Sequence, residues 1–115
     1  MITLYGIPNC DTVKKARKWL DAEAVDYTFH DFRADGLELP LLQSWLKTHA
    51  LLDIVNRRSA TWRQLSDAQK ALLGKGEGLD ILLAQPTLIK RPVLEKDGAV
   101  VSIGFKEADY RALFK

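Results

Sequence analysis

The sequence has little of three things that often announce a function: cysteine, histidine and long apolar runs. A single cysteine, Cys10, cannot form an internal disulfide. The two histidines, His30 and His49, lie far apart and have no metal-ligand partner at a useful spacing. No apolar run approaches the roughly 18 residues that a membrane span needs. We therefore expect no disulfide scaffold, no metal site and no transmembrane helix.

Charge of one sign is also scarce. The 17 Lys and Arg residues nearly balance the 15 Asp and Glu residues, and the net charge is +2. That charge is too small to favour nucleic-acid binding as the main role. The N-terminal segment lacks the basic leader and apolar stretch of a secretory signal. We expect a cytoplasmic monomer that binds neither nucleic acid nor a membrane.

The pattern of strands and helices predicts one α/β domain over residues 1–115. Residues 2–6 are β-branched and aromatic and predict a strand, and residues 26–32 alternate aromatic with polar and predict another. Between them, residues 12–24 have apolar positions at helical spacing. A strand–helix–strand unit of this kind favours parallel pairing of its strands.

Residues 37–85 have a different character, and we interpret them as a helical insertion within that domain. Helices are predicted at 40–46, 66–73 and 79–84, and Ser66 is the expected N-cap of the second of them. The segment is too short to hold an independent core.

Strand character returns after residue 85. Apolar runs at 92–95 and 99–103 flank Asp97-Gly98, a strong hairpin signal, and a helix is predicted at 107–114. The order of elements predicts a four-stranded mixed sheet with flanking helices.

Cys10 lies where the first strand gives way to the first helix. Free N–H groups and the helix dipole at such a position favour thiolate over thiol, and helix N-termini can lower the pKa of a cysteine from its usual value of about 8.5. Asp11 is a neighbouring negative charge that opposes ionisation unless its side chain turns back to cap the helix. The alternative is that Cys10 is a small buried hydrophobic residue. The polar turn at residues 8–12 argues against deep burial.

Two cysteine motifs are absent. The run Cys10-Asp11-Thr12-Val13 is not Cys-x-x-Cys, and Ala16 stands where a C-x5-R phosphate loop has arginine. Any redox cycle must therefore borrow a second thiol, either from a small molecule such as glutathione or from a partner protein.

Basic side chains occur in two further places. Lys90-Arg91 precedes Pro92 at the start of a predicted strand, and Arg57 and Arg58 follow Asn56 in the insertion. Arginine offers a planar fork to a carboxylate or an oxyanion. Taken alone, each of these basic stretches is explained better as a solvated turn or loop.

Several blocks together resemble a known family. They are TLYGIPNCDTVKKARKWL, DYTFHDFR, NRRSATWRQL, LIKRPVL and GFKEADY. They resemble the ArsC-like family of bacterial thioredoxin-fold proteins, nearest its YffB-type branch and close to the Spx-type regulators. The resemblance implies a thioredoxin-like sheet with a helical insertion, a reactive Cys10, and Arg91 facing that thiol. It also implies a cis peptide bond between Arg91 and Pro92.

Arsenate reductases of this family hold arsenate with three arginines, and only part of that set is found here. Arg91 matches the arginine of the Arg-Pro pair. The arginine expected in the insertion falls at Asn56, and the last falls near Gly104-Phe105, where there is none. A pocket lacking two of three guanidinium groups would bind a multiply charged oxyanion poorly.

We therefore hypothesise a monothiol oxidoreductase with Cys10 and Arg91 as catalytic residues. Glutathione is the expected co-substrate, and no tightly bound cofactor is expected. A thiol-bearing partner protein is an alternative source of the second thiol. The expected substrate-binding residues are Asn9, Thr12, Asn56, Arg57, Arg58 and Pro92. The resemblance leaves two alternatives open: a Spx-like regulator that binds RNA polymerase, and a true arsenate reductase.

Overall fold

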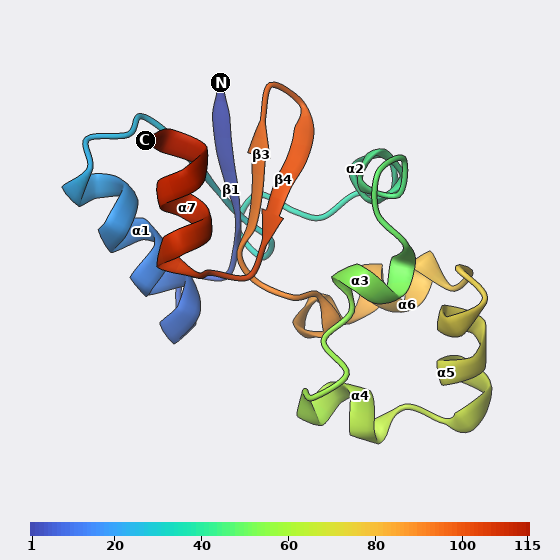
Figure 1. The fold of residues 1–115 in the computed structure, drawn as a ribbon. Helices are drawn as coiled ribbons and strands as arrows, with labels where there is room; N and C mark the ends of the chain where they lie inside the picture. Colours follow the sequence, from blue (N-terminus) through green and yellow to red (C-terminus); the bar gives the residue numbers. More distant parts are fainter. The chain divides into compact units, whose positions relative to one another are not determined.

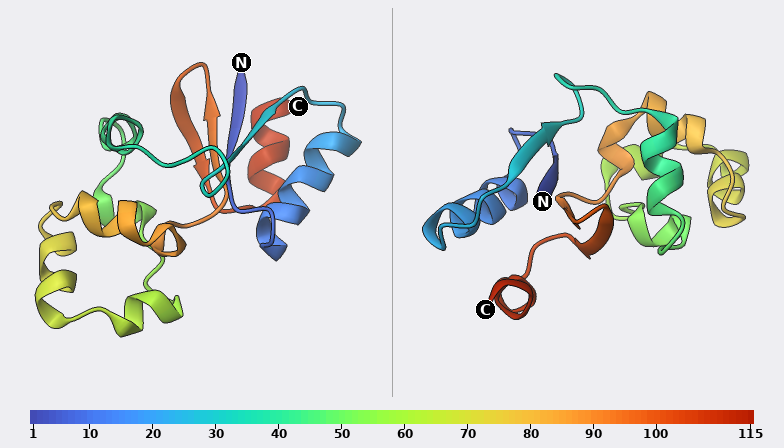
Figure 2. Two further views of the ribbon diagram at one scale, coloured as in Figure 1. Left: turned by 180° about the vertical axis from the view of Figure 1, so that it is seen from behind. Right: turned by 90° about the horizontal axis from the view of Figure 1, so that it is seen from above.

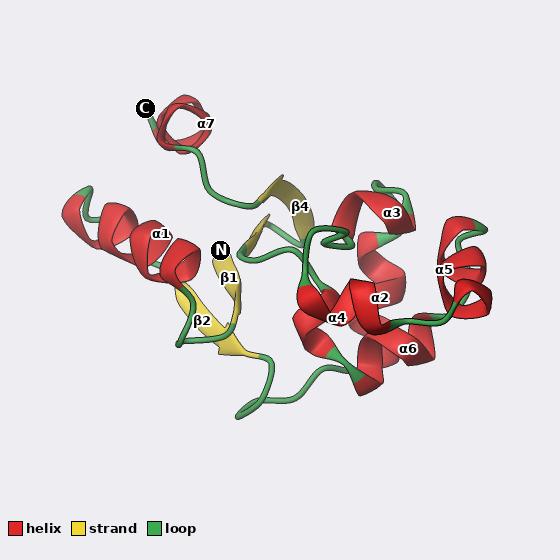
Figure 3. Ribbon diagram, turned by 90° about the horizontal axis from the view of Figure 1, so that it is seen from below, coloured by secondary structure: helices red, strands yellow, loops and turns green.

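The computed structural model describes all residues from 1 to 115, and the chain divides into two units (Figure 1). The sheet unit consists of Met1–Gly36 and Arg91–Lys115, and the helical unit is Leu37–Lys90. All the strands lie in the sheet unit, whereas the helical unit contains helices joined by loops (Figure 3).

The sheet has four strands, as the sequence predicts, and their order is β2-β1-β3-β4. The strands are β1 (Ile2–Gly6), β2 (Thr28–Asp31), β3 (Val93–Lys96) and β4 (Ala99–Ile103). β1 pairs in parallel with β2 and antiparallel with β3, and β3 pairs antiparallel with β4. The parallel pair of β1 and β2 needs a crossover helix between its strands, whereas the antiparallel pair of β3 and β4 needs only a tight turn.

The Asp97-Gly98 turn joins β3 to β4, as predicted. Both residues have positive φ, 54° at Asp97 and 83° at Gly98. Two successive residues with positive φ give the turn whose twist matches that of the flanking strands. Aspartate and glycine tolerate this conformation better than other residues, which is why the pair is a reliable signal.

Helices α1 (Asp11–Ala22) and α7 (Glu107–Phe114) lie beside each other and pack on one face of the sheet (Figure 2). The buried cluster joins both helices to the two central strands. Its members are Leu4, Ala16, Trp19, Leu20, Leu94 and Tyr110. This core fixes the start of α1 against the end of β1.

Gly6, the last residue of β1, allows α1 to approach closely. A Cβ atom added there would lie 2.8 Å from Cγ2 of Val13 in α1. Valine is β-branched and has little freedom to move aside. A larger residue at position 6 would therefore displace the first turn of α1.

The helical unit consists of short helices. They are α2 (Leu39–Trp45), α3 (Leu51–Ile54), α4 (Ala60–Gln64), α5 (Asp67–Gly74), α6 (Leu79–Ala84) and the 3-10 helix η1 (Pro86–Leu88). α2 packs on α6 and α3 packs on α5. The fully buried members of this unit include Leu42, Trp45, Ile54, Leu73, Leu82 and Leu88. None of the helices in the chain combines the length and the apolar character that crossing a membrane requires.

The helical unit extends beyond the predicted insertion of 37–85. A bridge between Val55 and Ile89, and a hydrogen bond of 2.8 Å from the Lys90 amide to the Ile54 carbonyl, tie its last residues to α3. The unit therefore continues to Lys90.

A side-chain cap and a glycine cap delimit α5. Ser66 caps α5 as predicted: its Oγ accepts from the Gln69 amide at 3.1 Å, and Gln69 Oε1 accepts from the Ser66 amide at 2.9 Å. At the other end, Gly76 has φ +78° and the amides of Gly76 and Glu77 donate to carbonyls of the last turn. This is the left-handed glycine cap that ends many helices.

Candidate functional site

Cys10 is the N-cap residue of α1. Its backbone is extended, with φ −141° and ψ 124°, and its carbonyl accepts the Lys14 amide at 2.9 Å. The thiol is free and half-buried. Cys10 is therefore not a buried core residue.

The surroundings of Cys10 favour the thiolate. Partial burial raises the pKa of Cys10. The Val13 amide, the Arg91 guanidinium and the Thr12 amide lower it, and together they outweigh the effect of burial. The net pKa lies below that of an ordinary thiol. Such a shift means that more of the sulfur is in its nucleophilic form at neutral pH.

Asp11 does not raise the pKa of Cys10, although a negative charge next to the thiol could do so. Its side chain is exposed in the first turn of α1, and it is not among the groups that shift the pKa of Cys10. An exposed carboxylate is well screened by water, so its effect on the neighbouring sulfur is small.

Arg91 and Pro92 lie at the start of β3, beside the central strand β1. The peptide bond between them is cis, as the family resemblance implies. Pro92 is buried and Arg91 is half-buried. The Arg91 side chain lies within hydrogen-bonding distance of the Cys10 sulfur. The structure thus brings together the two residues predicted to be catalytic.

The other predicted residues of the sheet unit contribute in different ways. Asn9 is exposed in the turn before Cys10, and the half-buried Thr12 supplies its amide to the sulfur. Val13 was not predicted to take part, because its side chain belongs to the core. Its backbone amide nevertheless lowers the pKa of Cys10 more than the Thr12 amide does. Only the helix geometry could have indicated it.

The predicted residues of the insertion lie in the helical unit, where their local roles can be described. Asn56 Oδ1 accepts the Arg58 amide at 3.1 Å, which closes a turn before α4. The side chains of Arg57 and Arg58 are exposed. No carboxylate forms an ion pair with either of them.

The position where arsenate reductases have their last arginine is used for structure in this chain. Gly104 has φ +80°, and its amide donates to the Pro92 carbonyl at 2.8 Å. Phe105 packs edge-to-face on Tyr110, with ring centroids 4.7 Å apart. A positive φ strongly favours glycine, so an arginine is not readily accommodated at position 104.

A buried polar pair on the sheet was not anticipated from the sequence. The Tyr5 hydroxyl donates to Glu95 Oε1 at 3.1 Å, and the Tyr5 ring lies 4.9 Å from that of His30. Burial, together with the Glu95 carboxylate, raises the pKa of Tyr5. No group of three or more His, Cys, Asp or Glu side chains is placed to hold a metal ion.

The chain matches proteins of one family along nearly its whole length. The model of the ArsC family matches residues 5–113. An uncharacterized protein of Haemophilus influenzae is 47% identical over 114 residues, covering 99% of each chain. The global transcriptional regulator Spx of Streptococcus pyogenes is 32% identical over 114 residues, which cover 97% of this chain and 84% of the regulator.

Solved structures agree with these sequence matches. A protein named YFFB superposes with a TM-score of 0.89 at 44% identity, covering 100% of both chains. An arsenate reductase (ArsC) related protein from Brucella melitensis gives a TM-score of 0.77 at 44% identity, covering 99% of this chain and 94% of the other. The chain therefore belongs to the ArsC family, and its four-stranded sheet and flanking helices form a thioredoxin-like fold.

Proposed function

We propose that this protein is a glutathione-dependent monothiol oxidoreductase in which Cys10 is the nucleophile. The observation that carries the proposal is a half-buried thiol at the N-terminus of α1 that faces Arg91 and two helix amides, an environment that lowers its pKa. The chain has no second cysteine, so the resolving thiol comes from outside. The reducing cytoplasm, where glutathione is abundant, is the setting we infer for the reaction.

The proposed cycle reduces a mixed disulfide between a substrate thiol and glutathione. The Cys10 thiolate attacks the glutathione sulfur, the substrate–sulfur bond breaks, and the substrate leaves as a thiolate that takes up a proton. A second glutathione thiolate then attacks the same sulfur in the Cys10–glutathione disulfide. Oxidised glutathione leaves and the Cys10 thiolate is restored, so two glutathione sulfurs carry the oxidation.

Arg91 has two tasks in this proposal. Its guanidinium stabilises the Cys10 thiolate, and it orients an anionic group such as a glutathione carboxylate. Asn9 and Thr12 lie close to Cys10 in the chain and Pro92 follows Arg91, and these three residues are the proposed binding surface around the sulfur.

The rate of Cys10 alkylation as a function of pH tests the thiolate. For the wild type we expect half of the maximal rate at a pH below about 8.5, the value for a free thiol. Arg91→Ala should raise this midpoint, and Arg91→Lys should restore part of the shift because it keeps the charge. Lys15→Ala, which removes an exposed cation from α1, is the matched control and should behave as wild type. A wild-type midpoint at or above 8.5 that Arg91→Ala leaves unchanged would refute the proposed site.

Oxidised glutathione tests the covalent step. Incubation with it should add one glutathione to the intact mass, and the adduct should map to Cys10. Reduced glutathione should then remove it, and Cys10→Ser should gain nothing. If the wild-type protein stays unmodified by oxidised glutathione but is still alkylated readily, Cys10 is reactive and the proposed dependence on glutathione is wrong.

A second candidate function is supported by the Spx relatives, which match 97% of this chain. In this alternative the protein binds RNA polymerase and acts as a regulator. Capture experiments with wild type and Cys10→Ser distinguish the two functions. Stoichiometric capture of RNA polymerase that does not depend on Cys10 would favour the regulator, and its absence would favour the oxidoreductase.

A further inference from the structure

A pocket in the helical unit lies outside every residue assigned to the Cys10 site. Its volume is about 410 Å³, which falls within the range of small-molecule sites. Its wall is built from segments distant in sequence: the residues that follow α2, the start of α3, and the C-terminal end of α5.

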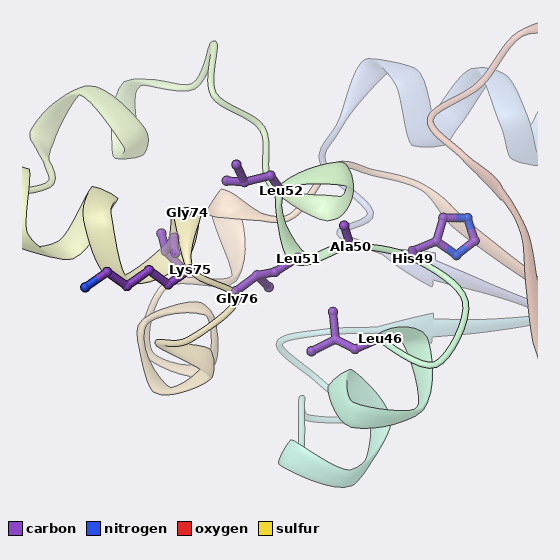
Figure 4. Close-up of a pocket in the computed structure, with 9 residues that line it drawn as sticks. Leu46, His49, Ala50, Leu51, Leu52, Gly74, Lys75 and Gly76 are labelled. Carbon is purple, nitrogen blue, oxygen red and sulfur yellow. The ribbon is translucent and has the colours of Figure 1, made fainter.

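The floor and walls of this pocket are apolar. Leu51 and Leu73 are buried, and Leu46 and Leu52 are half-buried along the sides. Figure 4 shows leucines from α3 and from the preceding loop between Lys75 at one end and His49 at the other. An apolar group that entered this space would be partly removed from water.

Two residues of the lining, Gly74 and Gly76, are exposed glycines. A Cβ atom added at Gly74 or at Gly76 would meet no heavy atom within 4 Å. Gly76 needs its positive φ of 78° to end α5, but Gly74 has no such requirement. The glycine at position 74 is thus explained neither by backbone conformation nor by a close contact.

The polar side chains of the pocket favour an anion. Lys75 is exposed and forms no ion pair, and His49 is the other ionisable residue of the lining. No carboxylate lines the pocket. Asp53, which is close in sequence, turns its side chain back to the Ala50 amide at 3.3 Å.

We propose that this pocket binds a small amphipathic carboxylate, a molecule with an acyl or aryl group and a single anionic head. The apolar part lies against the four leucines, and the head lies beside the Lys75 ammonium. Apolar burial supplies most of the affinity, and the partly exposed charge pair supplies the preference for the acid.

Octanoate and octan-1-ol are a suitable pair of probes because they differ mainly in the charged head. In an NMR titration of the ¹⁵N-labelled full chain, octanoate should shift the amides of Ala50, Leu51, Gly74 and Gly76 and should saturate with a Kd of about 1 mM or tighter. Octan-1-ol should bind the same site about 2- to 5-fold more weakly. Failure of octanoate to saturate these shifts by about 10 mM would overturn the proposal.

Substitutions at two positions locate the site. Gly74→Leu should fill the pocket and abolish the octanoate-induced shifts. If Gly74→Leu impairs folding, Gly74→Ala takes its place and should weaken the shifts. Lys75→Met should bring octanoate down to the affinity of octan-1-ol, whereas Lys47→Met, which removes an exposed lysine outside the lining, should bind as wild type. Unchanged octanoate binding by a folded Gly74→Leu protein, or equal affinity of wild type for the acid and the alcohol, would contradict the proposal.

Discussion

The start of α1 in the sheet unit differs from the starts of α4 and α5 in the helical unit. In the helical unit, Ser59 accepts the Trp62 amide at 3.1 Å to start α4, and Ser66 and Gln69 bond reciprocally to start α5. In the sheet unit, α1 has no such cap, because Cys10 occupies the capping position and its side chain forms no standard cap hydrogen bond. The amides that a serine would satisfy are directed at the sulfur instead.

α4 and α5 span five and eight residues, too few to be stable without caps and packing. α1 has 12 residues and a buried face on the sheet, so it tolerates an open end. The longer helix can leave its first amides available for chemistry because its packing stabilises it.

Charge follows the same division. The sheet unit carries ten of the 17 basic and ten of the 15 acidic residues, so its charges balance. The helical unit carries the remaining seven basic and five acidic residues, and with them the whole net charge of +2. An anion is therefore attracted more to the helical unit than to the sheet unit at long range.

Matched core substitutions should give the largest effects and would test whether the two units unfold together. Leu94 in β3 and Leu73 in α5 are both fully buried. Leu94→Ala and Leu73→Ala should each lower the free energy of unfolding by about 2–5 kcal/mol. We expect both to shift one urea transition followed by circular dichroism, because a unit of short helices is marginal by itself. Two separate transitions, each sensitive to only one substitution, would contradict this expectation.

Exchanging the caps would sharpen the comparison at about 1 kcal/mol. Cys10→Ser should be more stable than Cys10→Ala by about 0.5–2 kcal/mol, because serine accepts a hydrogen bond at an N-cap of this geometry. Ser66→Ala should cost a similar amount in α5. Equal stabilities of Cys10→Ser and Cys10→Ala in urea unfolding would show that the amides at the start of α1 are not available to a cap.

The pH dependence of stability should depend on the same thiol. The folded state lowers the pKa of Cys10, so its thiolate adds to the free energy of unfolding above the unfolded pKa of about 8.5. That contribution should disappear as the pH falls through the lowered folded pKa. Comparison of wild type with Cys10→Ala from about pH 6 to about pH 9 measures it. A difference between the two proteins that shrinks as the pH rises would have the wrong sign.

An exposed ion pair should give the smallest effect. Arg111 and Glu107 in α7 lie 3.5 Å apart and their side chains are 59% and 60% exposed. Arg111→Ala should change the free energy of unfolding by no more than about 0.5 kcal/mol, because exposed pairs of this type are screened by water and salt. The free energy of unfolding lost in Arg111→Ala should stay well below the difference between Cys10→Ser and Cys10→Ala. A loss as large as that difference would mean that surface charge matters more to α7 than we infer.

Most of the sheet unit could be predicted from the sequence because its signals are local. The Asp97-Gly98 turn and the helical spacing of Val13, Ala16 and Leu20 each indicate one structure. The short helices α3 and α4 were not predicted, because four or five residues do not complete a recognisable period. The cysteine, the Arg91 opposite it and the cis bond to Pro92 were predicted by combining position with family resemblance.

The backbone contribution to the site was predicted only in part. The sequence indicates free amides at the start of a helix, but not that Val13 directs the most effective one at the sulfur. The Tyr5–Glu95 hydrogen bond was missed because it joins residues that are 90 positions apart. Pairs of this kind depend on strand register, which a single sequence specifies poorly when the partner strands are distant.

The close approach at Gly6 has a consequence for how the nucleophile is placed. The separation between β1 and the first turn of α1 is set by a hydrogen atom where any other residue would have a methyl group or more. Adding that single carbon would push the leading end of the helix outward and carry the sulfur away from the guanidinium, although neither residue had been altered. The reactivity of this thiol is therefore controlled partly by a position that has no functional group.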